Sequence, residues 1–110
     1  MPIIKIDCEN ICDWDSFHNE FSTALGFPEF YGRNMNAWID CMSDLDDPNG
    51  GMSKTVVAEG QVLSLVLVNV KSFRVRVPEI YSALVDCAAF VNWRRLENSE
   101  APILALAFNE

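Results

Sequence analysis

The stretch Phe27–Asp47, FPEFYGRNMNAWIDCMSDLDD, decides how the rest of this 110-residue chain is organised. Pro28 cannot continue a helix and Gly32 permits a left-handed backbone, so the stretch opens with a loop. Asn34 is a good helix N-cap, because its side-chain oxygen can accept from a free amide of the first turn. We therefore predict an irregular loop that leads directly into a helix beginning at Met35.

The predicted helix has one apolar face and one polar face. Residues that recur at helical spacing on the apolar face are Met35, Trp38, Ile39, Met42 and Leu45. Those on the opposite face are Asn36, Asp40, Ser43 and Asp44. The aromatic residues Phe30 and Tyr31 lie in the loop just before this helix. Such an edge can present a few preorganised acidic groups to a partner.

The same stretch resembles the signature of the barstar family of intracellular ribonuclease inhibitors. That signature reads Leu-Pro-Glu-Tyr-Tyr-Gly, any residue, then Asn-Leu-Asp-Ala-Leu-Trp-Asp-Cys-Leu. Residues 27–42 here read FPEFYGRNMNAWIDCM, without a gap. The likeness extends more weakly upstream through Phe17 and His18, and downstream to the last helix and strand.

The resemblance implies a fold and a mechanism. The fold is α/β, a single domain over residues 1–110, with a small parallel sheet of about three strands and helices packed on it. The mechanism is that of an antitoxin or immunity protein in the bacterial cytoplasm. Carboxylates of the inhibitor take the places of phosphates in the basic active-site cleft of a ribonuclease.

The family's binding residues carry over position by position. Asp40 matches the dominant aspartate, whose carboxylate occupies the phosphate site. Gly32 and Asn34 match contact positions in the loop and at the helix start. Phe30 stands where the family has a contacting tyrosine, so the ring is kept and the hydroxyl is lost, although adjacent Tyr31 has one.

Three departures from the family pattern change the expected surface. Asn36 replaces a contacting aspartate, and Ile39 replaces a contacting tryptophan, while Trp38 one place earlier faces the core. Asn92 stands where the family has an acidic contact near the end of its long helix. We therefore predict a surface tuned to a toxin other than barnase. The predicted partner-binding residues are Phe30, Tyr31, Gly32, Asn34, Asn36, Ile39, Asp40, Ser43, Asp44 and Asn92.

Each of these residues also has a plainer interpretation. Asp40 and Asn36 could be ordinary solvated residues of an exposed helix face. Phe30 and Tyr31 could pack in the core. Asp44, at the end of the helix, is expected at the rim of the surface, where charges contribute little.

Charge supports a basic partner. The chain has 16 acidic and 8 basic residues, a formal net charge of −8. Ten of the acids and only two of the bases lie in residues 1–50. This asymmetry argues against binding to nucleic acid.

No signal peptide or membrane-length apolar run is recognisable, so we expect a cytoplasmic protein that does not associate with membranes and is a monomer when free.

Catalytic signatures are missing from the sequence. There is no phosphate-binding glycine loop, no HExxH and no second histidine to complete an acid–base pair with His18.

The four cysteines are Cys8, Cys12, Cys41 and Cys87. We expect them to be buried, reduced thiols, because their spacing matches no standard zinc site. We therefore expect no catalytic residue, metal or cofactor. A barstar-like module for a non-ribonuclease partner and a small metal- or thiol-dependent enzyme are the alternatives.

The remaining segments complete the α/β pattern. Pro2–Asp7, Val62–Val70 and Ile103–Phe108 are predicted strands, the second of them buried on both faces. A helix should begin at Trp14, capped by Asp13, and stop at Gly26.

Three further segments are less regular in sequence. A long helix from Pro78 is apolar nearly all round and is expected to be largely buried. Lys71–Val77 has no clear assignment. Thr55–Ala58 could form a short edge strand, within residues 47–61, which are an insertion relative to the family.

Overall fold

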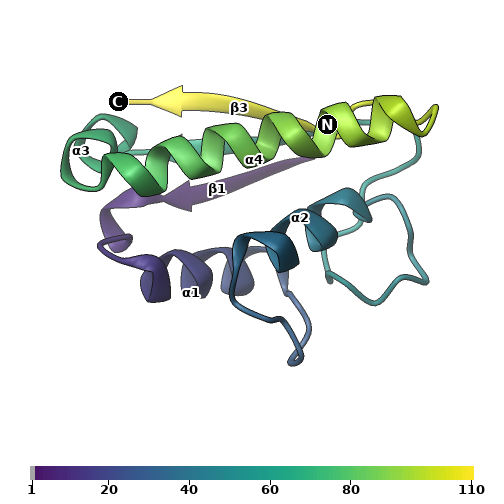
Figure 1. Ribbon diagram of the computed structural model, residues 1–110, viewed down its shortest axis with the longest axis horizontal. Helices are drawn as coiled ribbons and strands as arrows, with labels where there is room; N and C mark the ends of the chain where they lie inside the picture. Colours follow the sequence, from purple (N-terminus) through teal and green to yellow (C-terminus); the bar gives the residue numbers. More distant parts are fainter. Residues whose placement is uncertain (1) are drawn as a thin grey trace.

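The computed structural model describes residues 2–110, and its centre is a three-stranded parallel sheet (Figure 1). The strands are β1 (Ile3–Asp7), β2 (Leu63–Val68) and β3 (Leu104–Asn109), in the order β1-β2-β3. The helices are the short 3-10 helix η1 (Cys8–Asn10), α1 (Trp14–Leu25), α2 (Met35–Ser43), α3 (Val70–Arg76) and α4 (Pro78–Glu97). The predicted α/β class with a small parallel sheet is confirmed.

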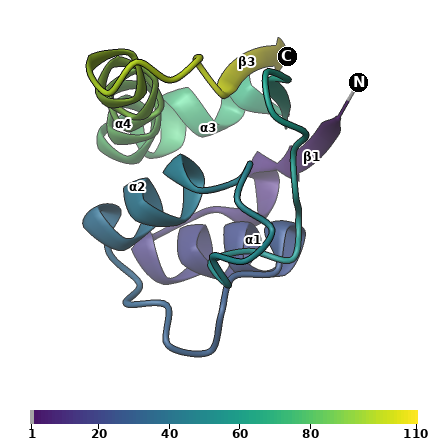
Figure 2. The same cartoon turned by 90° about the vertical axis from the view of Figure 1, so that its right-hand side faces the viewer.

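Helices α1, α2 and α4 lie on one side of the sheet (Figure 2). The central strand shows the result, because Leu63, Leu65 and Leu67 are buried while the alternate residues are only half-buried. Side chains of a strand point alternately to the two faces, so one face meets the helices and the other does not. The prediction that this strand is buried on both faces is therefore wrong.

The ends of α1 and α2 follow from local chemistry. The Asp13 carboxylate accepts from the Ser16 backbone amide at 2.8 Å, and Gly26 ends α1 in a left-handed conformation with φ 70°. The Asn34 side chain accepts from the Ala37 amide at 2.8 Å at the start of α2. All three of these predicted signals are confirmed, because each needs only neighbouring residues.

The segment without a clear assignment forms α3. Its Val70 and Phe73 side chains are buried. The Arg76 guanidinium donates to the carbonyl oxygens of Ile11 at 2.8 Å and Cys8 at 3.0 Å. Contacts with a distant part of the chain thus stabilise a helix of seven residues that is too short to be stable by itself.

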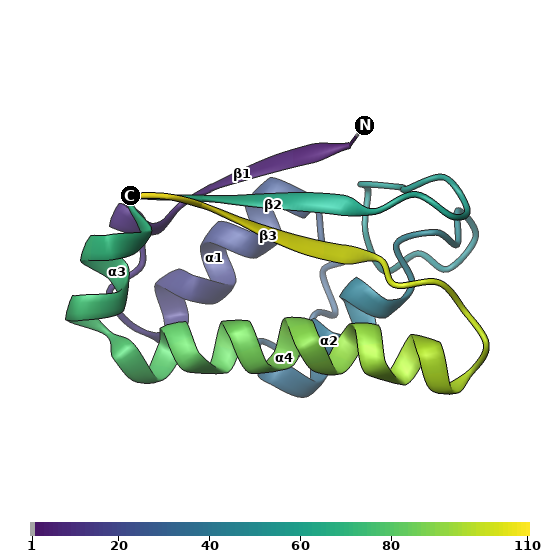
Figure 3. The ribbon, with the colours of Figure 1, turned by 90° about the horizontal axis from the view of Figure 1, so that it is seen from above.

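The long helix α4 is buried on one face only. Phe90 is 43% exposed and Trp93 is 55% exposed, with ring centroids 5.8 Å apart. The expectation that α4 is largely buried is therefore wrong. The views agree that α4 lies at the outside of the molecule, next to α2 (Figures 1 and 3).

The predicted edge strand at Thr55–Ala58 is not formed. The Thr55 amide donates to the Leu25 carbonyl at 3.1 Å, and the Val57 amide donates to the Leu45 carbonyl at 2.8 Å. These carbonyls lie at and just beyond the C-terminal ends of α1 and α2, where helices leave acceptors free. The insertion therefore covers two helix ends instead of extending the sheet.

Candidate functional site: a loop and helix surface

The loop before α2 and the exposed face of α2 form one continuous edge of the molecule (Figure 1). The exposed residues of this edge are Glu29, Phe30, Gly32, Arg33, Asn34, Asn36 and Asp40. We call the five of them that were predicted as contacts, Phe30, Gly32, Asn34, Asn36 and Asp40, the loop–α2 surface. Phe30 is 74% exposed, the same fraction as the most exposed of the other large apolar side chains. An aromatic ring in that position is available for contact and contributes nothing to the core.

Asp40 presents its carboxylate to solvent, with 60% of the side chain exposed. It shares that carboxylate with Arg94 of α4, whose Nη2 lies 3.4 Å from Asp40 Oδ1. The same Nη2 donates to Ser43 Oγ at 2.7 Å, and the guanidinium lies 5.9 Å from the centroid of the Phe90 ring. Asp40 is therefore accessible but already has one cationic neighbour.

Sequence reasoning did not find Arg94 as a neighbour of Asp40. The two residues are 54 positions apart, and basic residues in the last turn of a helix are already explained by the helix dipole. Only the packing of α4 against α2 brings the guanidinium to this edge.

Two of the predicted contact residues support the surface from within. Ser43 is buried, and its hydroxyl donates to the Ile39 carbonyl at 2.6 Å. The Asn92 side chain accepts from the amides of Ile103 and Leu104 at 3.0 Å each and holds α4 against the start of β3. These internal hydrogen bonds give Ser43 and Asn92 a structural role, while the partner contact predicted for each residue stays a prediction.

Of the other predicted contact residues, two are half-buried in the protein and one is exposed to solvent. Ile39 is half-buried against the core. Tyr31 is also half-buried, and its ring packs on Phe27 at 4.8 Å between centroids. Asp44 is exposed; partial burial and the neighbouring Asp47 raise the pKa of its carboxyl.

Tyr31 is also bonded to the single histidine. Its hydroxyl lies 2.6 Å from His18 Nδ1. Burial raises the pKa of Tyr31 far above its usual value. Burial, helped by the Arg33 charge, lowers the pKa of His18, so the imidazole is neutral at pH 7. The interpretation of His18 as a packed, hydrogen-bonded histidine is confirmed.

Arg95 anchors the C-terminal end of α2 from behind. It is only 5% exposed, and its Nη2 lies 2.7 Å from Asp46 Oδ2. It also donates to the Ser43 carbonyl at 2.8 Å and to the Ala101 carbonyl at 2.7 Å. One guanidinium thus joins α2, α4 and the turn before β3, and holds the loop–α2 surface to the scaffold.

The two buried thiols, Cys8 and Cys41, are unsuited to nucleophilic chemistry. Burial, with the nearby Asp40 and Asp44 charges, raises the pKa of Cys41 to about 11, and burial raises that of Cys8 to about 12. All four cysteines are free, and Cys12 is exposed, contrary to the expectation that all are buried.

Within residues 2–110, no three His, Cys, Asp or Glu side chains gather closely enough to hold a metal ion. The helices of this part of the chain include none with the length and apolar character needed to cross a membrane.

One family model matches residues 1–105 and is described as Barstar (barnase inhibitor). The chain belongs to the barstar family. No curated protein matches it. Membership of the barstar family indicates an inhibitor-like module, and the family's members are inhibitors, not enzymes.

Proposed function

We propose that this barstar-family protein is an antitoxin or immunity protein that inhibits a ribonuclease in the bacterial cytoplasm. The loop–α2 surface covers the basic active-site cleft of the enzyme, and Asp40 occupies the place of a substrate phosphate. The exposure of Asp40 on a helix held at both ends is the observation that carries this proposal.

The chemistry of the surface fits that role. A carboxylate paired with an arginine or lysine in a site closed to water forms short, charge-assisted hydrogen bonds, each contributing about 1.5–3 kcal/mol. The Asn34 cap and the Arg95 anchor fix both ends of α2, so little conformational entropy is lost when Asp40 binds. Phe30 offers a ring at the rim that can stack on the partner.

The surface also supports a partner that differs from barnase. Asn36 carries no charge where the family has an aspartate, and Arg94 reduces the negative potential around Asp40. Specificity is a difference in affinity between partners, and such changes redirect it. The same Arg94 observation favours the second candidate function, a binding module for a protein that is not a ribonuclease.

The first test compares two aspartates of α2 and its C-terminal end. Barnase and a panel of small basic ribonucleases are assayed for inhibition by the wild type, Asp40→Ala and Asp44→Ala. Against any enzyme that is inhibited, we expect Asp40→Ala to raise the inhibition constant at least about tenfold, or 1.4 kcal/mol. We expect Asp44→Ala to change it less than about threefold, as rim charges do.

Thermal unfolding supplies the control. Both aspartates are exposed, so both variants should melt close to the wild type. Equal inhibition by all three proteins would show that Asp40 is not the central contact. If no ribonuclease is inhibited and the protein captures a basic protein without nuclease activity, the second candidate function is correct.

A further inference from the structure

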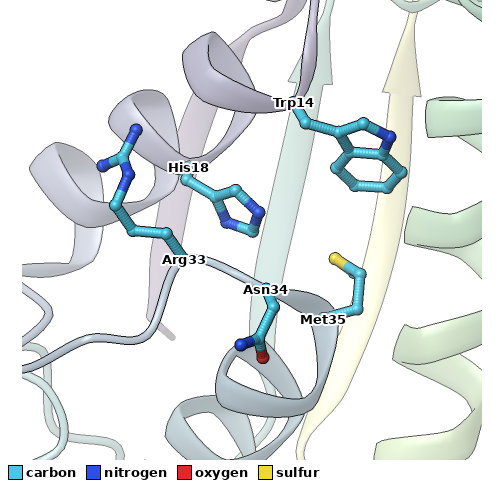
Figure 4. Close-up of a pocket in the computed structure, with 5 residues that line it drawn as sticks. All are labelled: Trp14, His18, Arg33, Asn34 and Met35. Carbon is cyan, nitrogen blue, oxygen red and sulfur yellow. The ribbon is translucent and has the colours of Figure 1, made fainter.

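A small pocket lies between the start of α1 and the loop before α2 (Figure 4). Its volume is about 240 Å³, and its lining residues are Trp14, His18, Arg33, Asn34 and Met35. Sites for drug-sized ligands have roughly 300–1,000 Å³, so this pocket has the size for one side chain. Asn34 belongs to both the pocket and the loop–α2 surface, which makes the two continuous.

The walls are aromatic and polarisable. The Trp14 and His18 rings are nearly parallel, with an interplanar angle of 25° and centroids 6.0 Å apart. The Met35 thioether faces them from the start of α2 (Figure 4). A thioether adapts to the shape of a neighbouring ring, so this lining is suited to an aromatic occupant.

The back of the pocket contains one unpartnered polar atom. His18 is 3% exposed, and its Nδ1 is bonded to the Tyr31 hydroxyl. Its Nε2 makes no hydrogen bond with any residue in the range 2–110, and the ring points into the space beside Trp14 and Met35 (Figure 4). This nitrogen is not among the fully buried polar atoms that lack a partner, so solvent reaches it through the pocket. An occupant that excludes that solvent must supply a hydrogen bond in its place, so a group able to do so is favoured.

The one charged residue that lines the pocket, Arg33, is already paired with a carboxylate. Arg33 Nη2 lies 2.6 Å from Asp15 Oδ1 and 3.0 Å from the Asp15 carbonyl. Arg33 has a φ of 54°, a left-handed conformation that costs a non-glycine residue free energy. The Asp15 contacts offset part of this cost and link the loop before α2 to the start of α1. A paired guanidinium does not require an anion, so the pocket favours an uncharged group.

We propose that this pocket receives a tyrosine side chain of the inhibited enzyme, at the α1 end of the loop–α2 surface. A phenol is flat, uncharged and of suitable size. Its hydroxyl can both donate and accept, so it can bond to His18 Nε2 in either tautomer of the imidazole. The assignment of the tyrosine to a partner enzyme rests on the proposed function; the preference of the pocket for a phenol does not.

The test uses three small probes and no ribonuclease. p-Cresol, acetyl-Gly-Tyr-Gly-amide and acetyl-Gly-Phe-Gly-amide are titrated into the wild-type protein and followed by NMR. We expect the first two to cause saturable shifts of the Trp14 indole N–H and the His18 ring, at millimolar concentrations. The phenylalanine peptide should bind at least about threefold more weakly, because it leaves Nε2 unpaired.

Two tryptophan variants serve as the matched pair. Trp14→Ala should abolish the shifts of the His18 ring, whereas Trp93→Ala, which removes an exposed tryptophan of α4, should leave the shifts of both Trp14 and His18 unchanged. The peptide comparison on the wild type stands even where Trp14→Ala folds poorly.

Three results would overturn the proposal. One is the absence of saturable shifts at Trp14 and His18. Another is equal binding of the two peptides, which would mean that Nε2 is not used. The third is binding of p-cresol without the tyrosine peptide, which would indicate a site for a free phenol instead of a protein side chain. Since no enzyme is present, none of these results bears on Asp40.

Discussion

At the scale of single residues, the pair formed by Asp40 and Arg94 sets the character of the binding surface. A partner's cation must share Asp40 with Arg94 or displace it. The pair is exposed and its 3.4 Å separation is long, so it stabilises the fold by at most about 1 kcal/mol. Arg94 is therefore better placed to tune binding than to stabilise the protein.

Replacing Arg94 tests this view. Arg94→Gln should tighten binding to an inhibited ribonuclease by up to about fivefold, because Asp40 loses its internal competitor. Arg74→Gln removes the same charge from an exposed pair with Glu110, away from α2, and controls for the change in net charge. Surface plasmon resonance measures both. Weaker binding by Arg94→Gln alone would mean that the guanidinium itself contacts the partner.

At the scale of elements, α2 is held by two different kinds of interaction. Its N-terminal end depends on Asn34, a local cap that the sequence reveals. Its C-terminal end depends on Arg95, a buried side chain that reaches it from α4. The short helix α3 depends even more on distant partners, which is why sequence periodicity gave no clear assignment.

Removing the buried guanidinium should be costly. Arg95→Met leaves the Asp46 carboxylate and two carbonyl oxygens without their donor, so we expect a loss of roughly 2–4 kcal/mol in the free energy of unfolding. The matched variant Arg74→Met breaks the exposed pair and should change it by less than about 1 kcal/mol. Urea denaturation followed by circular dichroism measures both. Similar losses for the two variants would contradict the anchoring role of Arg95.

At the scale of the whole molecule, charge asymmetry and folding act against each other. Residues 1–50 carry a net charge of −8, from ten acids and two bases, and residues 51–110 carry none. The fold then places two arginines of the neutral half, Arg94 and Arg95, against Asp40 and Asp46 of the acidic half. The long-range field remains negative, whereas the local field at the end of α2 is partly balanced.

Salt dependence separates these two fields. A negative field that attracts a basic ribonuclease should make association fall steeply between low salt and about 0.5 M, while dissociation changes little. Stopped-flow measurement of both rates over a salt series provides the test. An association rate that does not respond to salt would exclude a steering role for the acidic half.

The sequence by itself determined the family, the parallel α/β class, both ends of α1 and the start of α2. These features depend on caps, breakers and periodicity, which act between residues at most a few positions apart. Tertiary structure alone decided which face of β2 and α4 is covered, that Thr55–Ala58 bonds to helix ends, and that Ser43 and Asn92 form internal hydrogen bonds. It also brought Arg94 to Asp40 and built the Trp14–His18 pocket, because contacts between residues far apart in the chain exist only after the helices have packed.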